Sequence, residues 1–322
     1  MEPLPKGANF IRGKTLWEIG LHIAGNPATP YGGNRDMVIT VGSGSSERFR
    51  PWLRLATGSA ILAEGVATGD VEAAFVNPSA LLTQAYRGVG LFAAPLPVRI
   101  IACYPSWDRF VMAFHPRTGI RSVADIKAKK YPLRLSVRED PTHSTIVLID
   151  QILALHGFKL NDIESWGGRL LLCGGPGDQR RRLEPLRRGE IDAIFDEGIK
   201  TWLDEALAAG LVPIGFDTAE YQQLGKLGWR RVTIPKARFP GLAHDVDTLD
   251  FSGWPIYSSA SLPEQTAYDI CAALAAREAE IPWEQGTGGD AGRMVRETDA
   301  TPMDVPLHPG AARWLREYGA PG

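Results

Sequence analysis

Residues 133–157, LRLSVREDPTHSTIVLIDQILALHG, decide the fold of this chain. Apolar and polar side chains alternate over 133–138, which is the period-two pattern of a strand. The alternation breaks at Asp140-Pro141, and apolar residues at helical spacing follow from Ile146 onward. The stretch therefore predicts a strand, a polar loop and the start of a helix, which together form a unit typical of α/β proteins.

The polar loop carries Thr142, His143, Ser144 and Thr145 directly before the helix. A helix start presents unpaired backbone N–H groups and the positive end of the helix dipole, and nearby hydroxyl groups add hydrogen-bond donors. This arrangement suits an anion, most simply a carboxylate. The alternative is that Thr142 or Ser144 is only the N-cap that such a helix needs. The residues of this stretch leave both interpretations open.

Length and composition restrict the class of protein. The 322 residues suggest two domains, and 44% hydrophobic with 22% charged residues is an ordinary globular mixture. A net charge of −2 with mixed signs gives no electrostatic basis for nucleic-acid binding. No apolar run approaches the roughly 20 residues that span a bilayer, so we expect no direct membrane insertion.

The cysteines Cys103, Cys173 and Cys271 lie far apart, and each has apolar neighbours. We expect all of them in the core, with neither a disulfide framework nor a metal site. The loop 42–46, Gly-Ser-Gly-Ser-Ser, lacks the Lys-Ser/Thr ending of a phosphate-binding loop. We therefore expect neither a nucleotide nor another cofactor, and no bound metal.

Residues 1–36 are expected to form an N-terminal arm that packs on the surface. The apolar positions after Lys14 are interrupted by Glu18, Gly20 and His22, which is not the pattern of a signal peptide. From the chain as given we expect a cytoplasmic protein, and a periplasmic one if the true start lies upstream and supplies a signal.

Strands and helices alternate along the chain, which predicts an α/β architecture with mostly parallel sheets. Several predicted strands end in short polar groups, and in open α/β sheets ligands bind beyond the carboxyl ends of the strands. We therefore expect a small-molecule site where these loops converge. The polar groups are residues 43–46, 77–79, 142–145 and 196–197. The arginine-rich helix at 180–188 is interleaved with glutamates, which predicts a solvated face and not a polyanion site.

A family resemblance adds to these patterns. Its motifs are TGIRSVADIKAKK at 118–130, the 133–157 stretch continued as FKLNDI, RRGEIDAIFDEG at 187–198, RFPGL at 238–242 and PLHPGAARWLREYG at 306–319. In this order and spacing the chain from Val98 onward resembles the TAXI family, the extracytoplasmic solute receptors of tripartite (TRAP) transporters. The segment 56–79 also looks like the Thr-Gly-Gly-Ser loop, helix and strand of that family, with one glycine missing.

The resemblance implies a two-lobed, type II periplasmic-binding-protein-like fold, with a mainly parallel sheet in each lobe and a hinge between the lobes. It implies one lobe at 37–115 with 217–322 and another at 116–216. The implied ligand is a small organic acid or amino acid, and the implied partner is a TRAP membrane permease. The ligand-binding residues carried over are Thr57, Gly58, Ser59, Asn77, Thr142, His143, Ser144, Thr145, Asp196 and Trp202, to which the serine-rich loop adds Ser43 and Ser45.

The chain departs from the family pattern at several places. The segment between Val41 and Thr57 is short for the long first helix of the family. His143 stands where a small residue is usual, and Asp196-Glu197 places carboxylates where neutral residues are common. These departures bear on whether transport is the function.

Two functions compete. The first is a binding protein, as a transport receptor or a sensor, that captures a small organic anion. The second is an enzyme on the same fold, such as a decarboxylase or hydrolase, with His143 as acid/base and Glu197 or Asp196 as its partner. The sequence contains no nucleophile elbow, HExxH or paired metal-ligand spacing, so we favour binding.

Overall fold

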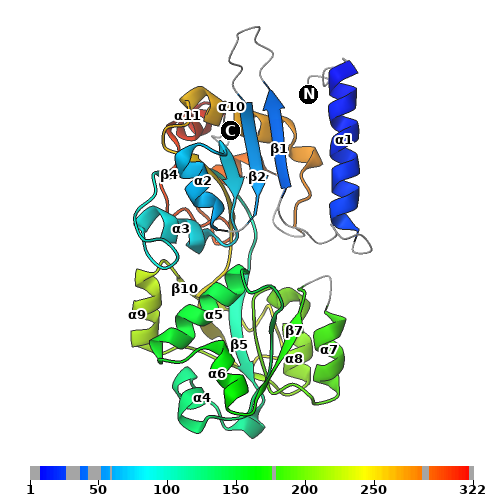
Figure 1. Cartoon of the computed structure of the whole chain (residues 1–322), viewed down its shortest axis with the longest axis vertical. Helices are drawn as coiled ribbons and strands as arrows, with labels where there is room; N and C mark the ends of the chain where they lie inside the picture. The colour runs from blue at the N-terminus through cyan, green and yellow to red at the C-terminus, as the bar shows by residue number, and fades with distance from the viewer. Residues whose placement is uncertain are drawn as a thin grey trace.

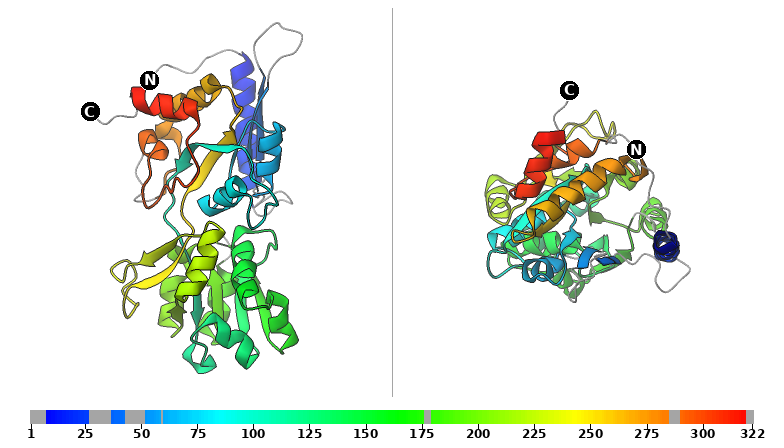
Figure 2. Two further views of the ribbon diagram at one scale, coloured as in Figure 1. Left: turned by 90° about the vertical axis from the view of Figure 1, so that its left-hand side faces the viewer. Right: turned by 90° about the horizontal axis from the view of Figure 1, so that it is seen from above.

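The computed structural model describes residues 8–26, 37–42, 52–58, 60–175, 179–284 and 290–318. The described residues form two α/β lobes, each built on its own sheet and flanked by helices (Figures 1 and 2). The two-lobed α/β fold expected from the sequence is confirmed. None of the helices in these ranges combines the length and the apolar character that a membrane crossing requires.

The first lobe has a sheet in the order β1-β2-β3-β12-β4. Its strands come from both ends of the chain, because β12 returns to this sheet after the second lobe is complete. The strands are β1 (Met37–Gly42), β2 (Trp52–Thr57), β3 (Ala73–Phe75), β4 (Val98–Tyr104) and β12 (Trp254–Ser259). The helices are α2 (Leu62–Thr68), α3 (Ser79–Arg87), α10 (Glu264–Ala276), α11 (Pro309–Tyr318) and the short η4 (Glu278–Glu280) and η5 (Ala291–Val295).

The second lobe has a sheet in the order β10-β11-β5-β8-β6-β7, and β9 pairs with β5. Its strands are β5 (Arg109–Phe114), β6 (Arg134–Arg138), β7 (Arg169–Cys173), β8 (Ala193–Asp196), β9 (Val212–Ile214), β10 (Arg231–Ile234) and β11 (Val246–Asp250). Its helices are η1 (Pro116–Thr118), α4 (Val123–Lys129), α5 (Ser144–Leu155), α6 (Leu160–Ser165), α7 (Arg180–Arg187), η3 (Ile199–Thr201), α8 (Leu203–Ala208) and α9 (Thr218–Lys226).

Both sheets are mixed, whereas the sequence predicted mainly parallel ones. β2 is parallel to β3, and β6 is parallel to both β7 and β8. β12 is antiparallel to β3 and β4, and β5 is antiparallel to β8, β9 and β11. The physical reason is that β5 and β12 each enter their sheet directly from the other lobe, so they run against their neighbours.

The second sheet takes β5, β10 and β11 from outside the range 116–216 that we expected for it. The chain passes between the sheets at 105–108 and again at 251–253. The lobes also meet at α3 and α5, where the Gln84 side-chain amide donates to Gln151 at 3.3 Å. One continuous hydrophobic core includes residues of both lobes, among them Leu82 and Ile149.

The N-terminal region differs from the family pattern in a specific way. β1 pairs antiparallel with β2, from Met37 opposite Thr57 to Gly42 opposite Trp52. The carboxyl end of β1 therefore lies at the opposite end of the sheet from Thr57. Helix α1 (Ala8–Gly25) stands at the outer edge of the first lobe, beyond β1 (Figure 1). No side chain at positions 11–26 is buried.

The core follows from the pattern that predicted α5. Ile146, Ile149 and Leu153 fall on one face of this helix, and all of them are buried. The side chains of Cys103, Cys173 and Cys271 are buried, which confirms their expected place in the core.

Replacing a buried residue of α5 should cost far more stability than replacing an exposed one. Ile149 is 0% exposed, so Ile149→Ala should lower the free energy of unfolding by about 2–5 kcal/mol through lost burial and the cavity that remains. Leu155→Ala, at a position 39% exposed on the same helix, should cost roughly 0.5 kcal/mol. Urea titration of both variants measures the difference, and equal losses would contradict this placement of α5.

Candidate functional site

The candidate site lies at the carboxyl ends of two neighbouring parallel strands in the second lobe. β6 ends at Arg138 and β8 ends at Asp196, and the register of the pair brings these ends together. Helix α5 begins shortly after β6, on the side of the second lobe that faces the first lobe (Figure 1). The predicted convergence of residues 142–145 and 196–197 is therefore present at this edge.

Arg138 connects the two strand ends through its guanidinium group. Its Nε donates to Asp196 Oδ1 at 2.7 Å, and its Nη2 donates to Glu197 Oε1. On the other side of Asp196, Arg182 Nη2 lies 2.6 Å from Oδ2. Arg182 also donates through Nε to Ser136 Oγ at 2.9 Å. The result is a buried chain of charges in which each carboxylate has a guanidinium partner.

Arg182 corrects the expectation that the arginines of 180–188 form one solvated face. It is 0% exposed and lies behind Asp196, with its guanidinium 5.7 Å from the ring centre of Trp202. The other arginines of this segment are exposed and pair with Glu184, Glu139, Glu205 or Glu190. Arg182 is buried because it shares the inner face of α7 with Leu186, one helical turn further on.

Asp108 and Glu197 form a second feature of the site, a carboxyl pair. Each is 8% exposed, and the two carboxyl groups are close enough to interact electrostatically. Burial raises the pKa of Glu197 well above its usual range, and the nearby Asp108 carboxylate adds to this shift. Burial also raises the pKa of Asp108, although Glu197 and the backbone N–H groups of Arg109 and Gly198 oppose it. Glu197 therefore keeps its proton to a higher pH than an isolated carboxyl group does.

His143 is the N-cap of α5, so neither Thr142 nor Ser144 has the capping role that we considered. The His143 Nδ1 accepts a hydrogen bond from the Thr145 N–H at 3.1 Å. An accepting Nδ1 in a neutral ring places the proton on Nε2, which lies 4.0 Å from Glu197 Oε1. In this tautomer Nε2 is a donor, and its distance from Glu197 is longer than that of a hydrogen bond.

The start of α5 offers fewer backbone donors than the sequence suggested. The Thr145 N–H is taken by His143 Nδ1, and the Ile146 N–H donates to the His143 carbonyl at 2.8 Å. Within the described ranges, this leaves the Ser144 N–H as the first-turn donor without a protein acceptor. The Thr142 hydroxyl donates to Asp140 Oδ1 at 2.7 Å. Thr145 is 0% exposed, and its hydroxyl has no hydrogen-bond partner.

The remaining predicted site residues are distributed over both lobes. In the first lobe, Thr57 accepts the Met37 N–H at 3.0 Å, next to Gly58, and Asn77 Oδ1 is buried without a hydrogen-bond partner. Trp202 is 1% exposed, and its indole N–H donates to the Glu197 carbonyl at 2.8 Å. It therefore supports the end of β8 from the core side. Ser43, Ser45 and Ser59 lie outside the described residues.

Sequence reasoning missed three charged members of the cluster: Arg138, Arg182 and Asp108. The signal for Arg138 was weak, because the residue occupies a polar position in an alternating strand. Asp108 lies in a segment between two predicted strands, where nothing in the pattern indicates burial. For Arg182 the signal was its i, i+4 spacing to Leu186.

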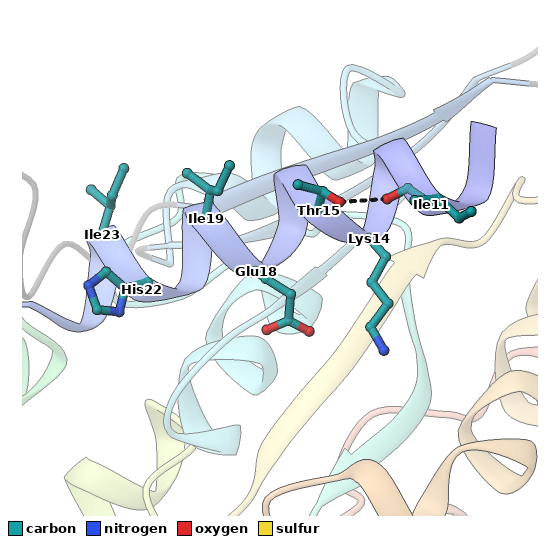
Figure 3. Close-up of a pocket in the computed structure, with 7 residues that line it drawn as sticks. All are labelled: Ile11, Lys14, Thr15, Glu18, Ile19, His22 and Ile23. Carbon is teal, nitrogen blue, oxygen red and sulfur yellow. Dashed lines mark hydrogen bonds between the residues drawn. The ribbon is translucent and has the colours of Figure 1, made fainter. Parts of the chain in front are cut away.

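A groove also occurs elsewhere, along the exposed helix α1. It has a volume of about 560 Å³ and is lined from one side by Ile11, Lys14, Thr15, Glu18, Ile19, His22 and Ile23 (Figure 3). It lies at the edge of the first lobe, away from the carboxyl pair. Within the ranges that the structure describes, His, Cys, Asp and Glu side chains form no group suited to a metal ion.

Breaking the buried charge chain should destabilise the second lobe. Arg182→Met leaves Asp196 with only one of its two guanidinium partners, and loss of a partner from a buried pair costs about 3–5 kcal/mol. The matched control is Arg181→Met on the same helix, whose pair with Glu139 is exposed and is worth roughly 0.2–1 kcal/mol. Denaturant unfolding measures the stability of both variants. A smaller loss of stability in Arg182→Met than in Arg181→Met would contradict the buried network.

The carboxyl pair should give stability a specific pH dependence. The pKa of Glu197 is raised in the folded state above its ordinary value of 4.5. The folded protein therefore binds the proton more tightly than the unfolded chain, and the stability from this site falls as pH rises above 4.5 toward the folded-state pKa. Glu197→Gln does not titrate, so the stability of the wild type relative to this variant should decrease over that window. Thermal unfolding of both proteins across a pH series measures this relative stability. A stability advantage of the wild type that increases with pH would contradict a raised pKa of Glu197.

Solved structures that are similar to this chain have low sequence identities and TM-scores. The structure of the alkanesulfonate-binding protein SsuA from Xanthomonas axonopodis pv. citri is similar at 13% identity and a TM-score of 0.30, over 82% of this chain and 71% of that one. Lactococcal OpuAC complexed with glycine betaine matches at 10% identity and a TM-score of 0.35, over 80% of this chain and 81% of that one. The glycine betaine/L-proline-binding protein ProX from Borrelia burgdorferi matches at 10% identity and a TM-score of 0.37, over 79% of this chain and 85% of that one.

The sequence itself gives the stronger result. Residues 54–319 match the NMT1-like family, which covers most of both lobes from β2 to the last helix. The narrower TAXI assignment remains an expectation from the resemblance. This chain belongs to the NMT1-like family.

Proposed function

We propose that this protein is a solute-binding receptor that captures a small organic acid or amino acid between its two lobes. One observation carries the proposal: Arg138, His143, Ser144 and Glu197 converge at the carboxyl edge of the second sheet, on the side that faces the other lobe. This is the edge at which open α/β sheets bind ligands. Membership of the NMT1-like family is consistent with such a role.

The ligand carboxylate is proposed to meet the start of α5. The Ser144 N–H and hydroxyl group and the buried Thr145 hydroxyl are the donors available there, and the helix dipole favours negative charge at this position. Asn77, in the first lobe, is the proposed contact from the opposite side, because its buried Oδ1 lacks a protein partner. Lobe closure then excludes water from the bound ligand.

A TRAP-type membrane permease is the proposed partner if the protein acts in transport, and a sensor would act without one. The division of the chain follows the sheets in this proposal, so that the chain passes from one lobe to the other at 105–108 and back at 251–253. Helix α1 belongs to a separate N-terminal arm. Location in the cytoplasm or the periplasm decides between the sensor and the transport receptor.

The ligand-binding test uses substitutions at the start of α5. Native mass spectrometry of the purified protein identifies a retained acid, and calorimetry then measures its affinity. Ser144→Ala and Thr145→Ala should each lose a hydrogen bond to a charged group, which is worth about 1.5–3 kcal/mol, or roughly tenfold or more in affinity. Thr142→Ala is the matched control, because the Thr142 hydroxyl is bound to Asp140. Unchanged affinity in both site variants would place the ligand elsewhere.

His143 distinguishes the binding protein from the enzyme in the same assay. His143→Asn retains a good N-cap and should leave stability nearly intact, whereas His143→Ala should cost about 1 kcal/mol. In a binding protein, both variants should reduce affinity only modestly. In an enzyme, both should reduce turnover of the retained acid by about 10²-fold or more while the acid still binds. Product release by the wild type would be required for the second outcome.

A further inference from the structure

A charged contact joins the two lobes beside the hinge, in addition to the chain itself. Lys200 lies in η3 of the second lobe, and its Nζ donates to Glu284 Oε2 of the first lobe at 2.7 Å. Arg230 also faces the first lobe, but its distances to Glu297 and Asp304 are longer, at 3.5 and 3.6 Å. The side chains of Lys200 and Glu284 are 37% and 26% exposed, so solvent and salt reach the pair.

Glu284 is fixed in position by the first lobe. Its backbone N–H donates to Tyr104 Oη at 2.8 Å, and this hydroxyl group in turn donates to the Pro282 carbonyl at 2.6 Å. The ring of Tyr104 also stacks on Trp254 and on Trp283, with ring centres 5.0 and 5.6 Å apart. The acceptor of the ion pair is therefore held in place at the end of β4 before Lys200 reaches it.

Both halves of the ion pair are attached to the first crossing segment. Ser106 Oγ donates to Glu284 Oε1 at 3.1 Å. Two residues further along, the Asp108 carboxyl group accepts the Gly198 N–H at 2.8 Å, and Gly198 begins the turn that carries Lys200. The ion pair therefore completes a closed ring of contacts around this segment.

The two crossing segments are also hydrogen bonded to each other. The Gly253 N–H donates to the Ser106 carbonyl at 2.9 Å, and the Phe251 N–H donates to the Asp108 carbonyl at 3.1 Å. A rotation of one lobe against the other must therefore change the shape of both segments together. Because the ring of contacts encloses the first segment, it resists such a rotation for as long as the ion pair is intact.

We propose that the Lys200–Glu284 ion pair is a salt-sensitive latch that holds the lobes in the orientation of this structure. An exposed ion pair adds little to the stability of a whole fold. Two lobe orientations, however, differ in free energy far less than the folded and unfolded states do, so one pair is sufficient to shift their populations. Ionic strength then regulates how often the lobes separate. This inference goes beyond the proposed function, because it holds without any ligand.

The experiment measures the distance between the lobes in the protein without a ligand. Spin labels are attached at Ile61→Cys in the first lobe and at Glu164→Cys in the second, both at exposed positions. The native cysteines are buried, so the labels should react at the introduced positions. In double electron–electron resonance, Lys200→Met and Glu284→Gln should each broaden the distance distribution and add a population that the wild type lacks.

Salt tests the latch without any substitution in it. In about 1 M sodium chloride the distribution of the wild type should change in the same way as in the two variants, because the pair is screened. The same salt should leave the distribution of Lys200→Met unchanged. A matched control is Arg187→Met, whose exposed pair with Glu205 lies within the second lobe, and it should give the wild-type distribution.

A charge-swapped double variant separates the ion pair from other effects of the substitutions. Lys200→Glu combined with Glu284→Lys should restore the wild-type distribution, because the attraction between the lobes returns. A double variant as broad as the single ones would overturn the latch, since the broadening would then not come from the pair. A wild-type distribution in both single variants, or a wild type that does not respond to salt, would overturn it as well.

Discussion

The fork of Arg138 between Asp196 and Glu197 is the interaction on which the rest of the site depends. A guanidinium group at the end of β6 holds two consecutive carboxyl groups at the end of β8, and nearly all of it is buried. Removing one member of such a group leaves an uncompensated charge in a medium that solvates it poorly. The same fork directs Glu197 toward Asp108 and His143. A lysine would not replace it, because a single ammonium cannot hold two carboxylates in a fixed plane.

The hinge region contributes to the site as well as connecting the lobes. Arg109 donates through Nη1 to Asp250 at 2.9 Å and to Ser252 at 2.5 Å, and through Nη2 to Asp299 at 2.7 and 2.9 Å. It therefore ties both crossing segments to the C-terminal part of the first lobe. Asp108, the neighbour of Arg109, accepts the Gly198 N–H at 2.8 Å. One half of the carboxyl pair is thus placed by the crossing segment, so its geometry is linked to the hinge.

The sequence predicted the elements well where one periodicity dominates. α5 and β6 lie within a few residues of the boundaries expected from the 133–157 stretch, because apolar side chains there face a single core. Strand direction was not predictable to the same degree. The parallel or antiparallel course of β5 and β12 depends on which lobe the chain has just left, and no local pattern encodes that. Residue 143 was correctly placed beside the helix start, but its capping role depends on a ring orientation that only tertiary contacts fix.

The buried charges were the least predictable part, for a reason that follows from the energetics. A buried arginine is tolerated only when a carboxylate meets it. The shared partner of Arg138 and Arg182 is Asp196 on β8, an element to which neither arginine belongs. Once these pairs form, each additional carboxyl group must lose its charge by binding a proton or gain a cation. His143 cannot supply that cation while its Nδ1 caps α5 in the neutral form. The hydrogen bond that caps α5 therefore requires an unprotonated Nδ1 on the imidazole ring beside Glu197.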